Sequence, residues 1–259
     1  MTKPLVLVAI LAKQKEGLLP YWLDSLSKWD YPKDRMILYV RSNNNTDNTE
    51  KILRNWVADN AKWYRHVIED YTNLETPLEN YGVHEWNVER FKALGAIRNR
   101  SVDIAFHADA DFYWVVDVDN FVLPDTLSTL VNYNLPVVSP MLEYAVYEDE
   151  SRHSAYSNYH FLIDDNGYYL DNINYYRVLN REITGLIKVP VVHCTYLIRA
   201  DAMPYTTYVD GTDDYEYVIF SRAMRKHNIP QYLDNQRTYG CLTLTENLQA
   251  VKEWHNGKL

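Results

Sequence analysis

The sequence predicts an α/β fold with a mainly parallel central sheet flanked by helices. In the first half of the chain, short apolar runs alternate with segments of helical spacing, and turn or capping residues separate them. A chain of 259 residues with 47% apolar content is also long enough to bury a substantial core. Because we find no internal repeat, low-complexity tract or linker, we expect one domain over residues 1–259.

The expected elements of the first half follow from apolar runs and helix signals. Tyr31-Pro32 ends the first helix, and Asp47, Asn48 and Thr49 offer capping side chains where the second begins. We expect strands at Leu5–Ala12, Met36–Arg41, about Lys62–Glu69 and Phe112–Val116, and helices at about Leu18–Trp29, Thr46–Asn60 and, after a polar loop, Trp86–His107.

The second half is less regular. We expect a helix over about Asn120–Asn132, with Pro124 in its first turn, and then a strand at Pro136–Met141. Residues 144–188 are rich in aromatic residues and Asn without a clear period, so we expect loops that cover the functional site or contact a substrate. A strand over residues 189–199 and a helix over about Thr212–His227 follow.

Composition and charge exclude several classes of protein. A formal net charge of -9 opposes nucleic-acid binding, which needs clustered Lys and Arg. The apolar run Leu5–Ala12 is too short to span a bilayer, and neither a basic leader nor a cleavage site accompanies it. Cys194 and Cys241 are too few for a disulfide framework. We expect no nucleic-acid partner, no membrane span and a location in the cytoplasm, or in the host cytoplasm for a viral protein.

Asp117 and Asp119 follow the apolar strand Phe112–Val116 directly. In open α/β sheets, ligands lie beyond the carboxyl ends of the strands. Two carboxylates separated by one residue, here Val118, reach the same divalent cation, and Mn²⁺ or Mg²⁺ held there stabilises the negative charge of a departing diphosphate. Asp-x-Asp alone is also common in ordinary acidic loops, so the surrounding motifs must decide.

Two further segments offer groups for a nucleotide. The segment Arg41–Thr49 follows the second strand, and the side chains of Asn43, Asn45 and Asp47 are suited to hold a base or ribose. The alternative is an Asn-rich turn with Asp47 as a helix cap. Arg98, one element before the acidic pair, has the fork geometry that binds phosphate, although an exposed helical Arg is usually only solvated or ion-paired.

The order of these motifs resembles that of glycosyltransferases of the GT-A fold, which bind nucleotide sugars. A more specific resemblance, to the collagen hydroxylysine galactosyltransferases, covers most of residues 5–242. The segments that carry it are Leu26–Leu53, especially Trp29–Met36 and Asp47–Arg54, together with Asp117–Phe121, Ser139–Glu143, Ser157–Tyr159, Val189–His193 and Thr195–Ile198.

This resemblance implies transfer of a hexose, galactose or glucose, from a UDP-sugar to an acceptor hydroxyl, that of hydroxylysine in a collagen-like protein. It also implies a requirement for Mn²⁺, or Mg²⁺, and inversion at the sugar carbon. Asn43, Asn45, Asp47, Arg98 and the Asp117–Asp119 segment with Val118 then belong to a donor-binding half, about residues 1–143. Residues 144–259 form the acceptor side.

The chain departs from that family in two respects. The animal enzymes have a secretory signal and a second related domain, whereas this chain starts almost at its first strand and contains one unit. A His expected before Tyr239-Gly240 is Thr238 here, which makes His193 the candidate third metal ligand. A single His in an apolar strand is otherwise a hydrogen-bonded structural residue.

An inverting transfer needs a base for the incoming hydroxyl. The segment Thr212–Glu216 offers three carboxylates, and comparison with the collagen enzymes places Glu216, or after a small shift Asp214, at an acidic position of the family. We rank Glu216 and Asp214 together as candidate bases, ahead of Asp213. Favourable charge at a helix N-terminus is the alternative explanation for Asp213 and Asp214.

Two other functions compete with glycosyl transfer. A haloacid dehalogenase-type phosphatase also uses Asp-x-Asp after an apolar strand, but there the motif opens the fold, whereas three strands precede it here. A non-catalytic binding protein that retains the nucleotide-sugar fold is the second. The presence of Asp117, Asp119, Asp214 and Glu216 favours catalysis, because recognition alone needs neither a metal nor a base.

Overall fold

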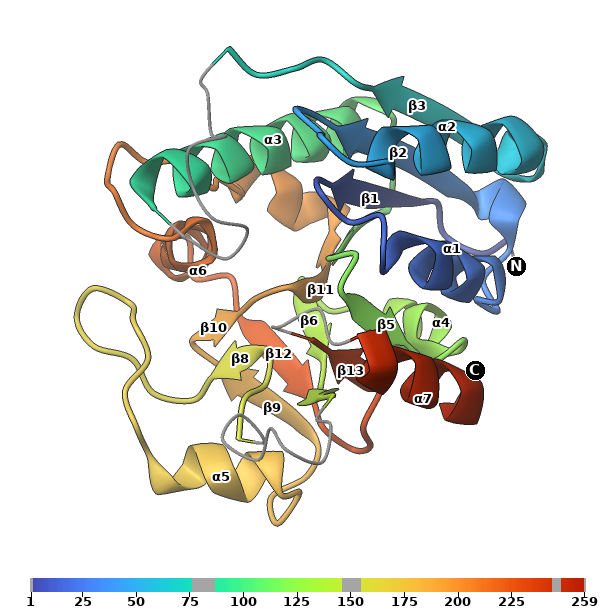
Figure 1. Ribbon diagram of the computed structural model, residues 1–259. Helices are drawn as coiled ribbons and strands as arrows, with labels where there is room; N and C mark the ends of the chain where they lie inside the picture. Colours follow the sequence, from blue (N-terminus) through green and yellow to red (C-terminus); the bar gives the residue numbers. More distant parts are fainter. Residues whose placement is uncertain (1, 76–86, 146–154, 244–247, 259) are drawn as a thin grey trace.

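The computed structural model describes residues 2–75, 87–145, 155–243 and 248–258. It is a three-layer α/β structure in which helices cover both faces of a central sheet (Figure 1). The predicted fold class is therefore confirmed. Within the described residues, no helix is both long enough and apolar enough to cross a membrane.

The central sheet has eight strands in the order β3-β2-β1-β4-β11-β6-β12-β9. Parallel pairing joins β3, β2, β1 and β4, and also β6 and β12, whereas β11 and β9 run antiparallel to their neighbours. The strands are β1 (Val6–Ala12), β2 (Met36–Ser42), β3 (His66–Asp70), β4 (Phe112–Val116), β6 (Val137–Pro140), β9 (Leu186–Val189), β11 (Thr195–Arg199) and β12 (Gln231–Asp234).

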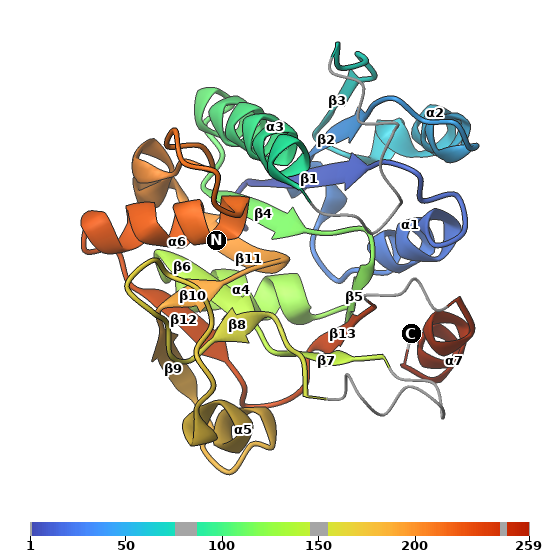
Figure 2. The ribbon, with the colours of Figure 1, turned by 60° about the vertical axis from the view of Figure 1, so that its left-hand side comes forward.

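Two smaller sheets lie at the carboxyl ends of these strands. One has the order β5-β13-β7, and the other pairs β10 with β8 (Figure 2). Their strands have only two or three residues each: β5 (Asn120–Val122), β7 (Leu142–Tyr144), β8 (Tyr159–His160), β10 (Val191–Val192) and β13 (Gly240–Leu242). These short pairings hold the segments that follow β4, β6 and β12 next to one another at the carboxyl ends of the central strands.

The alternation of side chains along β1 explains the two layers of helices. Val6, Val8 and Ile10 pack into one apolar cluster, and Leu7 and Ala9 pack into the other. The first cluster includes residues of α1 (Leu19–Ser27), α2 (Thr49–Asn60), α4 (Thr126–Tyr133) and α7 (Leu248–Lys258). The second includes residues of α3 (Val88–His107), α5 (Ile173–Leu179) and α6 (Glu216–Lys226).

The main differences from the sequence-based expectations concern short or interrupted elements. The expected helix Asn120–Asn132 is β5 followed by α4, so Pro124 precedes the helix. The expected strand at 189–199 is broken between β10 and β11, because Cys194 has a left-handed backbone with φ 62°. Trp86, the expected start of α3, lies outside the described residues. The single domain remains a prediction.

Candidate active site

Asp117 and Asp119, here called the Asp pair, lie just beyond the carboxyl end of β4, as predicted. The Asp117 amide donates to the carbonyl of Cys194 (3.1 Å), and the Asn120 amide donates to the carbonyl of Asp117 (2.9 Å). Val118 is buried in the apolar core, whereas the side chains of Asp117 and Asp119 keep 29% and 28% exposure. The turn therefore anchors itself through Val118 and leaves both carboxylates accessible.

Each carboxylate of the Asp pair contacts a basic side chain from another element. Arg98 of α3 places Nη2 2.7 Å from Oδ1 of Asp117. Lys15, in the loop after β1, places Nζ 3.0 Å from Oδ2 of Asp119. Burial raises the pKa of Asp117, and the Arg98 guanidinium opposes that rise. Our sequence reasoning missed Lys15, although its position directly after a parallel strand was a usable signal.

Glu216, the first residue of α6, approaches the same guanidinium. Its Oε1 lies 3.8 Å from Nε of Arg98, and its side chain is only 10% exposed. This separation exceeds hydrogen-bonding distance, so Nε of Arg98 is buried without a hydrogen-bond partner among the described residues. Burial raises the pKa of Glu216, and Arg98 again opposes the rise. Arg98 thus connects Asp117 with one of the two candidate bases.

The surroundings of Arg98 differ from those of an exposed helical residue that is free to bind phosphate. Its side chain is only 4% exposed, and its charge faces Asp117 and Glu216. A buried guanidinium needs such partners because an unpaired charge in the interior is costly. The geometry therefore gives Arg98 a positioning role between two carboxylates.

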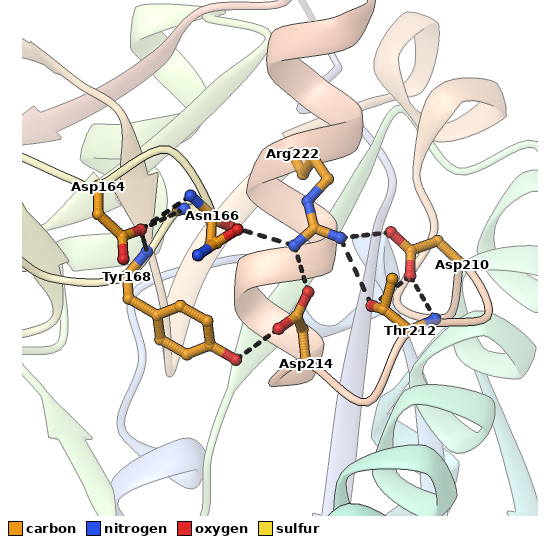
Figure 3. A network of polar contacts seen from close by, with 8 residues as sticks. Asp164, Asn166, Tyr168, Asp210, Thr212, Asp214 and Arg222 are labelled. Carbon is orange, nitrogen blue, oxygen red and sulfur yellow. Dashed lines mark hydrogen bonds and ion pairs between the residues drawn. The ribbon is translucent and has the colours of Figure 1, made fainter.

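Asp214 belongs to a different network (Figure 3). Its Oδ1 accepts a hydrogen bond from the Tyr168 hydroxyl at 2.7 Å, and its Oδ2 pairs with Nη2 of Arg222. Burial alone raises the pKa of Asp214, but hydrogen bonds from Arg222 and Tyr168 outweigh burial and hold it below the ordinary value. Since both oxygens are engaged, Asp214 stabilises the chain before α6, and the geometry separates it from Glu216 as a candidate base.

His193 lies in an aromatic cluster. Its Nδ1 is 2.9 Å from Sγ of Cys194, and its ring centre is 5.0 Å from that of Tyr217, 5.5 Å from His160 and 5.8 Å from Tyr156. Burial lowers the pKa of His193 well below the ordinary value, so the ring is neutral. Within the described residues, no three His, Cys, Asp or Glu side chains are grouped to hold a metal. His193 therefore packs within this cluster, and its role as a third metal ligand stays a prediction.

The Asn-rich segment after β2 forms hydrogen bonds with the loop after β1 and with the start of α2. Oδ1 of Asn45 accepts from an amide of the 14–16 loop at 3.0 Å, and Oδ2 of Asp47 accepts from another at 3.1 Å. Oδ1 of Asp47 also accepts from the amide of Thr49 at the start of α2. Asn43 is buried, with 5% exposure. Asn45 and Asp47 therefore hold the turn and the helix start, and through the 14–16 loop they hold Lys15 beside the Asp pair.

The chain matches the sequence profile of the glycosyltransferase family 25 N-terminal domain over residues 3–254. It is 32% identical to procollagen galactosyltransferase 2 of Homo sapiens over 256 residues, 94% of this chain and 39% of that protein. It is 30% identical to the inactive glycosyltransferase 25 family member 3 of Mus musculus over 254 residues, 94% of this chain and 41% of that protein. The chain thus spans about two fifths of the length of these relatives.

Solved glycosyltransferase structures share the fold. S. aureus TarS 1-349 in complex with UDP-GlcNAc matches with a TM-score of 0.55 and 14% identity, over 92% of this chain and 58% of that one. The mannosyltransferase PcManGT from Pyrobaculum calidifontis, in complex with GDP-Man and Mn²⁺, matches with a TM-score of 0.55 and 15% identity, over 100% of this chain and 63% of that one. These matches confirm the predicted GT-A fold. Since the family profile covers nearly the whole chain and its sequence relatives agree, the protein belongs to glycosyltransferase family 25.

Proposed function

We propose that this chain transfers a hexose, galactose or glucose, from a UDP-sugar to the hydroxyl of hydroxylysine in a collagen-like protein. The observation that carries the proposal is the contact of Asp117 and Glu216 with the guanidinium of Arg98, beside Asp119, which pairs with Lys15. The names of the procollagen galactosyltransferases, 32% identical over most of this chain, support the choice of donor sugar and acceptor.

In the proposed reaction, Glu216 is the base. The bond between the sugar carbon and the phosphate oxygen breaks, and its electron pair leaves with UDP. The acceptor oxygen forms the new bond to that carbon from the opposite face, and its proton passes to a carboxylate oxygen of Glu216. Because burial raises the pKa of Glu216, its ionised form is a stronger base than an exposed Glu, and the charge of Arg98 opposes that rise.

The Asp pair has the donor set of a Mn²⁺ or Mg²⁺ site, with two carboxylate ligands that remain accessible. Asp117 and Asp119 would hold such a cation through their carboxylate oxygens. Such a cation supplies charge stabilisation at the departing diphosphate. Within the protein, Arg98 fixes the position of Asp117, and Lys15 supplies positive charge beside Asp119.

The second candidate function is a non-catalytic binding protein with the same fold. An inactive family member that is 30% identical over 94% of this chain favours it. Such a protein would bind the nucleotide without turning over the sugar. Retention of the Asp pair together with Glu216 supports catalysis instead.

The deciding experiment measures donor hydrolysis, and transfer to hydroxylysine, for UDP-, GDP- and ADP-sugars with and without Mn²⁺. We expect turnover of a UDP-hexose that depends on the metal and is lost in Asp117→Asn and Asp119→Asn. UDP binding by calorimetry accompanies each assay. Intact UDP binding without turnover would establish the binding-protein alternative, and UDP affinity indifferent to chelator and to both variants would remove the metal from the proposal.

A further inference from the structure

A hairpin formed by residues 162–170 exposes apolar side chains near the start of α6. The amide of Leu170 donates to the carbonyl of Leu162 (3.1 Å), and Ile163 forms a bridge with Tyr169. Leu162, Tyr169 and Leu170 are 39–42% exposed, and Ile173, three residues further on, is 70% exposed. We call these four residues the hairpin patch. Leu162 and Leu170 lie on one face of the hairpin, and Tyr169, opposite Ile163, lies on the other. Large exposed apolar side chains that cluster within one short segment are typical of an interaction site.

The turn of the hairpin has a fixed conformation. Oδ1 of Asp164 accepts hydrogen bonds from the backbone amides of Asn166, Gly167 and Tyr168, at 2.8–2.9 Å. Gly167 has φ +101°, and a Cβ there would lie 3.0 Å from Nη2 of Arg225. The side chain of Asp164 therefore closes the turn, and the turn packs against α6.

The network in Figure 3 fastens this turn to the chain that enters α6. Arg222 donates to the carbonyl of Asn166 (3.1 Å) and pairs with Asp214 and with Asp210 (2.7 Å), while Tyr168 donates to Asp214. Because α6 begins with Glu216, Arg222 holds the hairpin at a fixed position relative to the proposed base. A ligand bound to the hairpin patch would therefore lie at a fixed position relative to Glu216.

Aromatic rings connect the hairpin patch with the start of α6. The ring centre of Tyr169 is 5.5 Å from that of His160, which is 5.7 Å from Tyr217. Tyr217 is adjacent to Glu216 in the chain and packs 5.7 Å from Tyr215, which is 37% exposed. Because His160 is buried, these rings pack the hairpin against the start of α6 and so keep it near Glu216.

The charge of this segment defines the partner. Residues 155–176 contain Asp164, Asp165 and Asp171 and no Lys or Arg. The neighbouring basic side chains are engaged: Arg177 pairs with Glu182, Arg222 pairs with Asp210 and Asp214, and Arg225 donates to the carbonyl of Pro190. Such a surface attracts a basic polypeptide and repels an acidic one, and its exposed apolar and tyrosine side chains suit the proline-rich, extended backbones that aromatic surfaces recognise. We propose that the hairpin patch binds the acceptor polypeptide, an extended chain with lysine-type side chains. The proposal rests on the proposed function and assigns its acceptor-binding surface.

The test uses charge substitutions of opposite sign at one exposed position. Leu170→Lys removes the apolar contact and adds repulsion for a basic peptide, whereas Leu170→Glu removes the same contact and adds attraction. Trp63→Lys and Trp63→Glu are matched controls, because Trp63 is 58% exposed and lies in the short helix after α2, which is not part of the hairpin. Ile173→Lys is a second test position that is even more exposed.

Transfer is measured to a basic collagen-like peptide containing hydroxylysine and to free hydroxylysine. We expect Leu170→Lys and Ile173→Lys to raise the KM for the peptide about tenfold and Leu170→Glu to raise it less. Transfer to free hydroxylysine and UDP affinity should stay at the parental values, because neither ligand reaches the patch. Equal effects of Lys and Glu, or equal losses with both acceptors, would overturn the proposal.

Binding of the same labelled peptide, followed by fluorescence anisotropy, separates this proposal from the proposed function. If the parent binds the peptide and Leu170→Lys weakens binding while no donor is turned over, the acceptor surface stands and the catalytic assignment fails. If the parent transfers sugar to free hydroxylysine but does not bind the peptide, catalysis stands and the acceptor surface fails.

Discussion

If a divalent cation binds the Asp pair as proposed, it competes with Lys15 for Asp119, so replacing Lys15 with Met should strengthen metal binding. The ammonium lies 3.0 Å from Asp119, and the two side chains are 17% and 28% exposed. An ion pair of this kind lies between the exposed pairs that contribute up to about 1 kcal/mol and the buried pairs whose rupture costs about 3–5 kcal/mol. We take a value of about 1.4 kcal/mol, which corresponds to a tenfold change in affinity.

The assay is a titration with Mn²⁺ alone, followed by calorimetry and by electron paramagnetic resonance of the free ion. Lys28→Met is the matched control, since it changes net charge equally and removes a pair with Asp24 (3.2 Å) on the exposed end of α1. We expect the Kd for Mn²⁺ to fall about tenfold in Lys15→Met and to stay unchanged in Lys28→Met. An unchanged or higher Kd in Lys15→Met would refute competition and indicate that the ammonium stabilises the site for the metal.

Three further predictions concern the base, the central guanidinium and a buried histidine. Glu216→Gln should lower sugar transfer roughly a hundredfold at unchanged UDP affinity. Asp214→Asn should instead lower the melting temperature and keep transfer per folded molecule near the parental value. A large loss of transfer in Asp214→Asn with little loss in Glu216→Gln would exchange the roles of the two residues. Arg98→Met should lower the free energy of unfolding by about 3 kcal/mol in urea titrations, because the substitution leaves two carboxylates facing each other without a cation. Arg98→Lys should recover part of that loss. A change below about 0.5 kcal/mol, the size expected for a surface substitution, would contradict this role. Burial lowers the pKa of His160 to about 4, so at falling pH the unfolded chain binds a proton before the folded chain does. The free energy of unfolding should therefore decrease as pH falls from about 6.5 to 4. His160→Phe should reduce this decrease, and identical stability profiles of the two proteins against pH would exclude His160 as its source.

The parallel core of the fold was predictable because its strands are continuous apolar runs. β1, β2 and β4 begin and end within one residue of the expected positions, as buried parallel strands do when turn residues bound them. The three-residue strand β5 was mistaken for a helix start, because it forms by pairing with β13, more than a hundred residues away in the chain. Pairing over such a separation leaves no local pattern in the sequence.

The site was partly predictable for the same reason. Asp117 follows a strand that the sequence defines, and the GT-A topology brings Glu216 to the same edge. Asp214 was indistinguishable from Glu216 in the sequence, since only the fold shows that Arg222 and Tyr168 occupy its two oxygens. The left-handed turn at Cys194 was also invisible, because a non-glycine residue with φ 62° is stabilised by tertiary contacts.

The charges around Arg98 explain why donor and metal should bind together. Asp117, Asp119 and Glu216 carry three negative charges when ionised, and Arg98 and Lys15 carry two positive charges, which leaves one net negative charge. A diphosphate adds further negative charge, and like charges in a partly buried site repel each other strongly. A divalent cation at the Asp pair would reverse that balance, while the buried Arg98 would stay paired with Asp117 and Glu216. The two basic residues therefore stabilise the acidic site before the donor arrives, but they do not supply enough positive charge for the donor itself.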